Sequence, residues 1–137
     1  MAGHTGMVGA ALVRRLASEG CAVLTIGRAE LDLREGPAVR AWMAEARPDA
    51  VVLAAARVGG ILTNARAPAD FLFDNLAIQA NLIEAAHRAG VGKVLILGSS
   101  CIYPRDAAQP IREDALLGGP LEAVSYTHLT LPTNREV

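Results

Sequence analysis

Three glycines near the start of the chain constrain its fold more than any other feature. Gly3, Gly6 and Gly9 recur at every third position, and an apolar pattern of helical spacing follows them directly. Glycine fits a tight turn and lets the backbone approach a ligand closely, because it has no Cβ. Such a turn at a helix N-terminus presents free N–H groups and the positive end of the helix dipole, which suit a pyrophosphate. The triplet is a close relative of the dinucleotide-binding fingerprint.

The residues in front of the glycine triplet are too few for the strand that the fingerprint normally follows. Only Met1 and Ala2 precede Gly3. We therefore interpret the sequence as a fragment that lacks the central strand of its fold, with Met1 a misread start inside a longer reading frame. The neighbours of a missing strand are left with unpaired edges. We expect the chain as given to be marginally stable or insoluble.

Composition indicates a globular chain and excludes several classes of function. Its 137 residues are enough for one domain, and 52% of them are apolar while 20% are charged. A net charge of −1 gives no electrostatic case for nucleic acid or an anionic membrane. The sequence shows no apolar run of membrane-spanning length, no secretory signal and no metal-ligand spacing. Cys21 and Cys101 are too few for a disulfide framework, so a cytoplasmic location is expected.

Apolar patterns along the chain alternate between helix and strand. Helices are predicted directly after the glycine turn and over residues 35–47 and 68–89, and buried strands over residues 21–26, 50–55 and 93–97. Gly20, Pro48 and Gly90 are expected to end the helices. Cys21 is interpreted as a small core residue, and Trp42 as a residue of the core or one that fills a groove. The alternation predicts an α/β fold, a doubly wound parallel sheet of the Rossmann type.

Ligands in such sheets bind beyond the carboxyl ends of the strands, where four stretches of this chain fall. They are the glycine turn, residues 27–28, residues 54–60 and residues 98–101. Arg28 follows the strand after the fingerprint, where an acid favours NAD and an arginine accommodates the 2′-phosphate of NADP. Arg28 therefore favours NADP, although Glu30 is a nearby acid and a surface arginine is the alternative interpretation.

Two further groups of polar residues are ambiguous from spacing alone. Ser99 and Cys101 could bind a carbonyl oxygen and move a proton, but a capping serine and an inert cysteine are favoured. The predicted long helix also carries unusual amide side chains, for which solvated positions are favoured over support of an active site: Asn75, Gln79 and Asn81.

Four segments together resemble the GDP-L-fucose synthase family, which belongs to the extended short-chain dehydrogenase/reductase superfamily. They are Gly-His-Thr-Gly-Met-Val-Gly (3–9), Ala-Ala-Ala-Arg-Val-Gly-Gly-Ile (54–61), Pro-Ala-Asp-Phe (68–71) and Leu-Gly-Ser-Ser-Cys-Ile-Tyr-Pro (97–104). The resemblance covers about residues 2–122. It implies NADPH-dependent epimerisation of a GDP-4-keto-6-deoxy-mannose at C3 and C5, followed by reduction at C4. It also implies a homodimeric parent enzyme.

The resemblance also assigns roles to residues by position. Ser99 would hydrogen-bond the C4 keto oxygen, and Cys101 would transfer protons during epimerisation. Donors that hold an enolate oxygen acidify the neighbouring carbon, and a thiol of tuned pKa can then act as acid or base. The expected cofactor-binding residues are Gly3, His4, Thr5, Gly6, Met7, Val8, Gly9, Arg28, Ala29, Glu30, Leu31, Asp32, Leu33, Leu97, Gly98, Ser99 and Ser100.

This chain departs from the family pattern at two places. Thr5 stands where the family has a basic residue that helps to bind the 2′-phosphate, which weakens the case for NADP. The Tyr-x-x-x-Lys helix of the family is also absent. His128 occupies the position where the family has its tyrosine, and Tyr126 lies two positions before it. The tail resembles translated sequencing-adapter read-through. We therefore expect a partial NADP-binding domain over residues 1–122 and a non-native or disordered tail over residues 123–137.

Other readings of the sequence remain open at this point. A different epimerase or dehydratase of the extended family, acting on another NDP-sugar, would share the fold but usually carries threonine or serine where Cys101 stands. A non-catalytic dinucleotide-binding module would agree with the missing Tyr-x-x-x-Lys pair.

Overall fold

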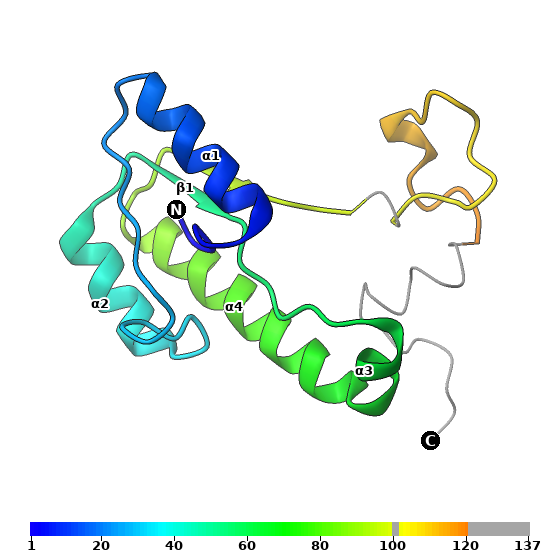
Figure 1. Cartoon of the computed structure of the whole chain (residues 1–137), viewed down its shortest axis with the longest axis horizontal. Helices are drawn as coiled ribbons and strands as arrows, with labels where there is room; N and C mark the ends of the chain where they lie inside the picture. Colours follow the sequence, from blue (N-terminus) through cyan, green and yellow to red (C-terminus); the bar gives the residue numbers. More distant parts are fainter. Residues whose placement is uncertain (100–101, 121–137) are drawn as a thin grey trace. The chain divides into compact units, whose positions relative to one another are not determined.

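The computed structural model describes residues 1–99 and 102–120 (Figure 1). They form two compact units, one of residues 1–57 with 73–97 and one that includes residues 58–72, 98–99 and 102–120. The elements in order are α1 (Met7–Ser18), α2 (Gly36–Ala46), β1 (Ala50–Leu53), α3 (Ile61–Arg66), α4 (Pro68–Arg88), β2 (Lys93–Ile96) and the 3₁₀ turn Glu113–Ala115. Within the described ranges, every helix is too short or too polar to cross a membrane.

The predicted helix ends are confirmed, each with a local cause. After α1 the chain turns at Gly20, whose φ of +72° is in the left-handed region, and the amide of Cys21 donates to Leu16 O at 3.3 Å. Before Pro48, Arg47 caps α2 with a φ of +42°. Gly90, with a φ of +70°, follows α4. The short helix α3 was not predicted from the sequence.

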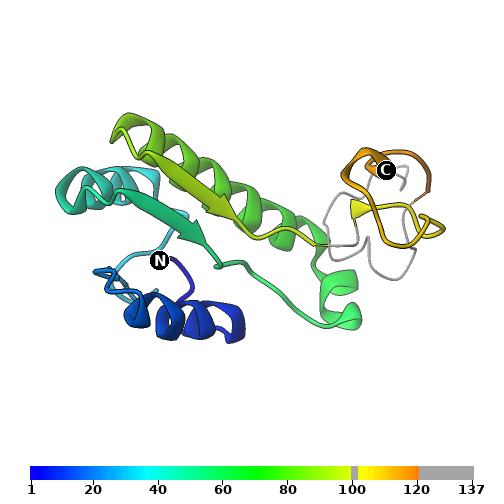
Figure 2. The same cartoon turned by 90° about the horizontal axis from the view of Figure 1, so that it is seen from above.

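The sheet of the first unit is parallel, as predicted. β1 pairs with β2 in the register Ala50 opposite Lys93 to Leu53 opposite Ile96. On the other side of β1, Ala2 forms a parallel bridge to Leu53, with Ala2 N donating to Val52 O at 2.9 Å and Ala54 N donating to Ala2 O at 2.9 Å. Figures 1 and 2 show β1 between α1 and α4. Helices on both faces of a parallel sheet are the doubly wound arrangement.

The buried core of this unit lies between α2, β1 and α4. Val39 and Met43 of α2 are almost fully buried, and they pack with Val51 and Leu53 of β1 and with residues of α4. Trp42 is partly buried against this cluster, as predicted. The remaining members are Ala2, Leu31, Leu82, Ala85 and Ala86. This core fixes the C-terminal end of β1 relative to α4, and both of these elements line the candidate site described below.

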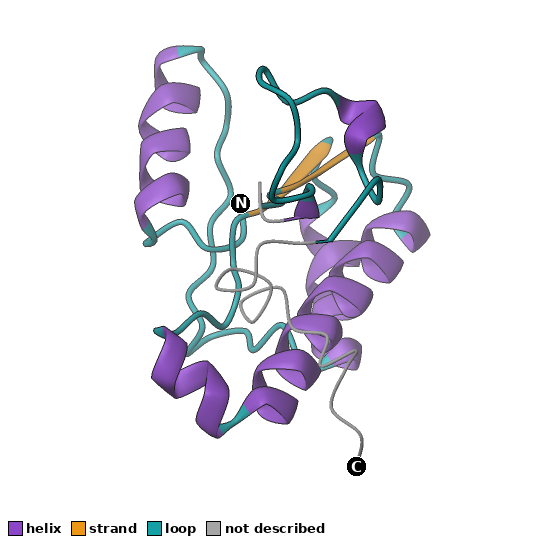
Figure 3. Cartoon of the chain, turned by 90° about the vertical axis from the view of Figure 1, so that its right-hand side faces the viewer, coloured by secondary structure: helices purple, strands orange, loops and turns teal. Residues whose placement is uncertain are grey.

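The predicted strand over residues 21–26 is wrong. The whole segment between α1 and α2 contains no strand, as Figure 3 shows, and Cys21 is exposed rather than buried. A strand needs a partner along its edge, and the two residues before Gly3 supply one such contact, from the Met1 amino group to Leu24 O at 2.8 Å. With so short a partner, the segment runs as a loop and leaves Cys21 at the surface.

The predicted burial of β2 is also wrong, although the strand itself is confirmed. Val94, Leu95 and Ile96 are 38–48% exposed. A strand of a doubly wound sheet is buried only where layers cover both of its faces. Among the described residues β2 has one paired edge, to β1, and neither of its faces is fully covered. The apolar run therefore predicted the strand but not its exposure.

An apolar groove of about 530 Å³ borders the free edge of β1. Its walls come from α1, the 21–24 segment, α2 and β1, and include Leu16, Val23, Trp42 and Val51. Backbone N–H and C=O groups of alternate residues point to the same edge of a strand. Val52 C=O accepts from Ala2 at this edge of β1, so Val52 N–H and Ala50 C=O also point to it. The groove therefore combines apolar side chains with backbone groups that continue the Ala2 bridge.

Extending the chain by five valine-rich residues before Ala2 is expected to stabilise this unit. We expect the free energy of unfolding to rise by about 2 kcal/mol, the burial of several side chains less the cost of ordering them. Urea denaturation followed by circular dichroism measures the change. An extension of equal length made of serine is the control. Equal stability of the two extended chains would show that the groove does not accept a strand.

Candidate functional site

The glycine turn has the tight geometry that its sequence predicts. Gly3 adopts a φ of +82°, and the amide of Gly6 donates to Gly3 O at 3.1 Å. A Cβ on Gly3 would lie 2.6 Å from the backbone of Ala54 and Ala55, and one on Gly9 would lie 2.0 Å from Gly3 O. The turn therefore packs against the end of β1 and against the first turn of α1 at distances that only glycine allows.

The turn leads directly into the N-terminus of α1. Gly6 is the N-cap and makes no side-chain cap, and α1 begins at Met7. The first amides of a helix have no acceptor within the helix, and the dipole adds positive charge there. Met7 and Val8 are exposed while Gly9 is buried. This end of α1 can therefore receive an anionic group such as a pyrophosphate.

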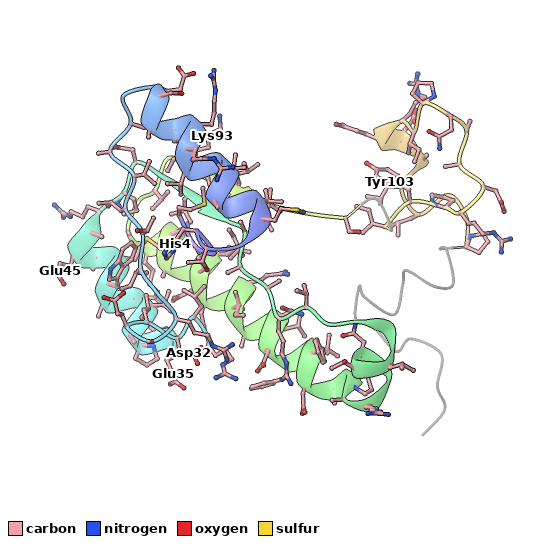
Figure 4. All side chains as sticks on the ribbon, in the orientation of Figure 1. His4, Asp32, Glu35, Glu45, Lys93 and Tyr103 are labelled. Atoms are coloured by element: carbon pink, nitrogen blue, oxygen red, sulfur yellow. The ribbon has the colours of Figure 1, made fainter. Side chains whose placement is uncertain are left out.

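A cavity of about 190 Å³ lies beside this turn. Of the predicted cofactor-binding residues, those that line it are Gly3, His4, Thr5, Arg28, Leu31, Asp32 and Leu33. Figure 4 labels His4 and Asp32, which come from separate loops of the same unit. Further lining residues are Ala55, Ala56, Arg57, Asp74 and Ile78, from the end of β1 and from α4. The cavity thus joins the glycine turn to the loop that precedes α2.

Residues 27–35 form a loop that is hydrogen-bonded within itself. The amides of Glu30 and Leu31 both donate to Gly27 O at 3.0 Å, and the amide of Gly27 donates to the Glu30 carboxylate at 2.9 Å. Further along, the amide of Glu35 donates to Asp32 O at 3.0 Å. Glu30 is thereby engaged with its own turn. Neither Ala29 nor Glu30 lines the cavity.

Two aspartates and two arginines form a network along the cavity wall. Arg34 donates to Asp32 with contacts of 2.6–3.1 Å, and its Nη1 donates to Asp74 at 3.1 Å. Arg57 Nη1 donates to the other oxygen of Asp74 at 2.8 Å. The hydrogen bonds from Arg34 lower the pKa of Asp32 to about 2, and those from Arg34 and Arg57 lower the pKa of Asp74. Both carboxyl groups are therefore ionised at neutral pH.

The charges of this network cancel, because each arginine is matched by one aspartate. Arg28 is the further cation that lines the cavity. It is exposed, and within residues 1–99 and 102–120 its guanidinium makes no hydrogen bond or ion pair. Arg28 therefore gives the lining of the cavity a net positive charge that an anionic ligand can use.

Two of the amide side chains on α4 are not solvated, contrary to the favoured prediction. Asn75 accepts the amide of Arg57 at 2.8 Å and donates to Arg57 O at 3.0 Å. Asn81 donates to Leu33 O at 3.0 Å and to Arg34 O at 2.8 Å. Both side chains are partly buried because they satisfy backbone groups of the loops that line the cavity. Gln79 is exposed, as predicted.

The segment expected to carry the chemistry falls largely outside the cavity-bearing unit. The amide of Leu97 donates to Leu53 O at 3.2 Å, and its side chain is exposed. Gly98 and Ser99 belong to the second unit, where Ser99 O accepts the amide of Ile102 at 3.3 Å. The remaining residues of interest lie outside the described ranges, namely Ser100, Cys101, Tyr126, His128 and the tail over 123–137.

Sequence reasoning missed the network residues Arg34 and Asp74. It placed the stretch 54–60 at the ligand edge without singling out Arg57, which comes two positions after the predicted strand. Asp74 stands beside Asn75 on a helix otherwise rich in apolar residues, and such a pair of polar neighbours was the available signal. Within the described residues, no His, Cys, Asp and Glu side chains cluster as three or more potential metal ligands.

Residues 1–128 match a protein family described as the NAD dependent epimerase/dehydratase family. Over 122 residues the chain is 57% identical to the GDP-L-fucose synthase of Sinorhizobium fredii, an alignment that covers 89% of this chain and 39% of the relative. The chain thus spans about two fifths of the length of the curated relative.

Solved structures with the same fold include cofactor complexes. A Campylobacter jejuni GDP-D-glycero-L-gluco-heptose synthase, crystallised in the presence of NADPH, has a TM-score of 0.83 and 37% identity, covering 93% of this chain and 37% of that one. A GDP-L-fucose synthetase from Naegleria fowleri, bound to NADP, has a TM-score of 0.77 and 28% identity, covering 96% of this chain and 41% of that one.

Proposed function

Because the chain belongs to the NAD-dependent epimerase/dehydratase family, we propose that it is the cofactor-binding part of an NADP-dependent enzyme that converts GDP-sugars. The specific reaction that we propose is that of a GDP-L-fucose synthase, with epimerisation at C3 and C5 of GDP-4-keto-6-deoxy-mannose followed by reduction at C4. The observation that carries the proposal is the cavity beside the glycine turn, lined by His4, Arg28 and Asp32.

The residues that would hold the dinucleotide fit its chemistry. The glycine turn and the N-terminus of α1 suit the pyrophosphate. Leu31 and Leu33 give the cavity an apolar surface for the adenine, and Arg28 provides a cation for the 2′-phosphate. Thr5 lines the same cavity and offers a hydroxyl in place of the family's basic side chain. NADP, when bound, would supply the hydride for the reduction.

Replacing Arg28 with alanine is expected to weaken the binding of NADP⁺ by about 1.5–3 kcal/mol, the worth of a charge-assisted hydrogen bond. Binding of NAD⁺ should change little, since it lacks the 2′-phosphate. Isothermal titration of the chain with each dinucleotide measures both affinities. Arg14→Ala, which removes an exposed arginine of α1 that does not line the cavity, is the matched control. Equal affinity of the unaltered chain for both dinucleotides would reject the assignment of NADP.

A second enzymatic function is favoured by a specific observation. The Campylobacter jejuni protein, which is 37% identical to this chain, is named for a GDP-heptose rather than for GDP-fucose. A reductase acting on another GDP-sugar would use the same cofactor site. The segment around Ser99 and Cys101 is the discriminating feature, because a proton-transferring thiol serves the epimerisation steps.

The remaining expectations about the whole protein stay proposals. Ser99 is proposed to hold the keto oxygen, and Cys101 to transfer protons. A homodimeric parent and a cytoplasmic location are proposed from the family resemblance and from the cysteine content. A non-catalytic binding module is the competing interpretation, and a gene that continues into a Tyr-x-x-x-Lys helix and a substrate domain would reject it.

A further inference from the structure

We propose that Asp74, on α4, is a positioning residue that sets the preference of this site for a 2′-phosphorylated dinucleotide, by holding the loop that carries Arg28. The inference rests on the proposed function, because it concerns the cofactor of that same site. Asp74 does not contact Arg28 itself. It acts through Arg34, which lies six positions after Arg28 in the same loop.

The loop of residues 27–35 is built to move as one piece. The bonds of Glu30 and Leu31 to Gly27 close its first turn, in which Arg28 lies. Asp32 closes the second turn, where its carboxylate accepts from both the amide and the guanidinium of Arg34. The two turns follow one another without an intervening residue, so we expect a shift of Arg34 to be passed along the loop to Arg28.

The loop is fastened to α4 at two points. Asn81 binds the backbone carbonyls of Leu33 and Arg34, and Asp74 binds the Arg34 guanidinium. These two points lie about two helical turns apart along α4. One anchor alone would leave the loop free to rotate about it. The second anchor fixes the direction in which Arg28 faces the cavity.

Asp74 is well placed to act as the second anchor. Its side chain is only 8% exposed, and its two oxygens accept from two arginines of different loops. The Arg57 that it also binds has its backbone clamped by Asn75, the residue next to Asp74. Asp74 therefore holds the loop of Arg28 at a fixed position relative to the end of β1. Removing Asp74 takes a buried charged partner away from both arginines.

The test is the ratio of the affinities of the 137-residue chain for NADP⁺ and NAD⁺, measured by isothermal titration in the Asp74→Asn variant. Asparagine keeps the size of the side chain and removes the charge-assisted bonds. We expect the ratio to fall about 3- to 10-fold, a usual size for coupling through a contact that touches no ligand. Asp70→Asn, an exposed acid one turn earlier on α4, is the matched control and should keep the ratio.

A simple change of charge would act in the opposite direction. Removing a negative charge beside an anion site strengthens anion binding, so a raised ratio in Asp74→Asn would overturn the inference. An equal loss of affinity for both dinucleotides would also overturn it, because that result describes a structural role only. Failure of the proposed function is distinguishable, since the unaltered chain would then already show no preference for NADP⁺.

A second variant keeps the inference testable if Asp74→Asn does not fold. Arg34→Lys retains a positive charge beside Asp32 but loses the planar guanidinium that spans Asp32 and Asp74. We expect it to lower the same ratio to a similar extent. The double variant should then show no larger loss than the stronger single one. If Arg34→Lys kept the NADP⁺/NAD⁺ affinity ratio of the unaltered chain, Asp74 would not act through Arg34.

Discussion

Solvent deuterium exchange into a GDP-4-keto-6-deoxy sugar is expected to fall by about 10²- to 10⁴-fold when Cys101 is replaced by serine, the usual effect of losing a general acid–base group. Epimerisation at C3 and C5 requires a group that gives and takes a proton, whereas reduction at C4 requires a hydride and an acid. A serine hydroxyl is a far weaker acid than a thiol, so it cannot replace Cys101 in proton transfer. The measurement is made by mass spectrometry without NADPH, in a full-length protein that carries residues 2–122.

Two controls separate proton transfer from binding in this experiment. NADPH affinity should survive in Cys101→Ser, because the change removes little volume and no charge. Ser99→Ala should slow both exchange and reduction, since a donor to the keto oxygen stabilises the enolate and the developing alkoxide alike. Unchanged exchange in Cys101→Ser would reduce Cys101 to a packing residue, and a GDP-sugar reductase without epimerase activity would become the better assignment.

The change of Gly9 to alanine is expected to lower the free energy of unfolding by about 3–4 kcal/mol, at the upper end of the cost of overpacking. Gly9 lies within α1, where alanine would ordinarily stabilise a helix by about 1 kcal/mol relative to glycine. The added Cβ would stand 2.0 Å from Gly3 O, and neither backbone segment can move without breaking the turn. Denaturant melts of the variant and the parent chain measure the effect.

Gly6 offers the matched control for this experiment. A Cβ at Gly6 would lie 3.5 Å from Gly3 O, which is an ordinary contact, and its φ of −72° suits any residue. Gly6→Ala should therefore cost no more than about 1 kcal/mol, the loss of a tolerable N-cap. A Gly9→Ala chain as stable as Gly6→Ala would mean that the first turn of α1 is free to adjust. The pyrophosphate site would then not be pre-formed.

The elements that sequence patterns predicted best are those whose signals are local. Gly20, Pro48 and Gly90 end their helices because left-handed backbone and the missing proline amide act on the chain itself. The glycine turn was predicted for the same reason. Segment 21–26 failed because strand formation depends on a partner, and a run of apolar residues carries no information about whether that partner is present.

The site was predicted in part, for a related reason. Arg28 was found from its position after a predicted strand, and the structure places it in the cavity wall with Asp32 and Leu33. The Arg34–Asp74 contact joins residues 40 positions apart, so no spacing rule could find it. Asn75 and Asn81 were identified as unusual. Their partners are backbone groups, which every residue carries, so the sequence does not indicate which residues they bind.

Helix α4 holds both loops that line the cavity, the loop before α2 and the loop after β1. Asn81 holds the loop before α2 and Asn75 holds the loop after β1, and both contacts are to backbone atoms rather than to side chains. These two backbone contacts do not depend on the side chains of the loops, whereas the contacts of Arg34 and Arg57 with Asp74 do. The residue that selects the dinucleotide is therefore separate from the backbone contacts that hold its loop. Arg28 and Ala29 could be exchanged to accept a different dinucleotide, while Glu30 keeps the turn closed and the pyrophosphate turn and the opposite wall remain as they are.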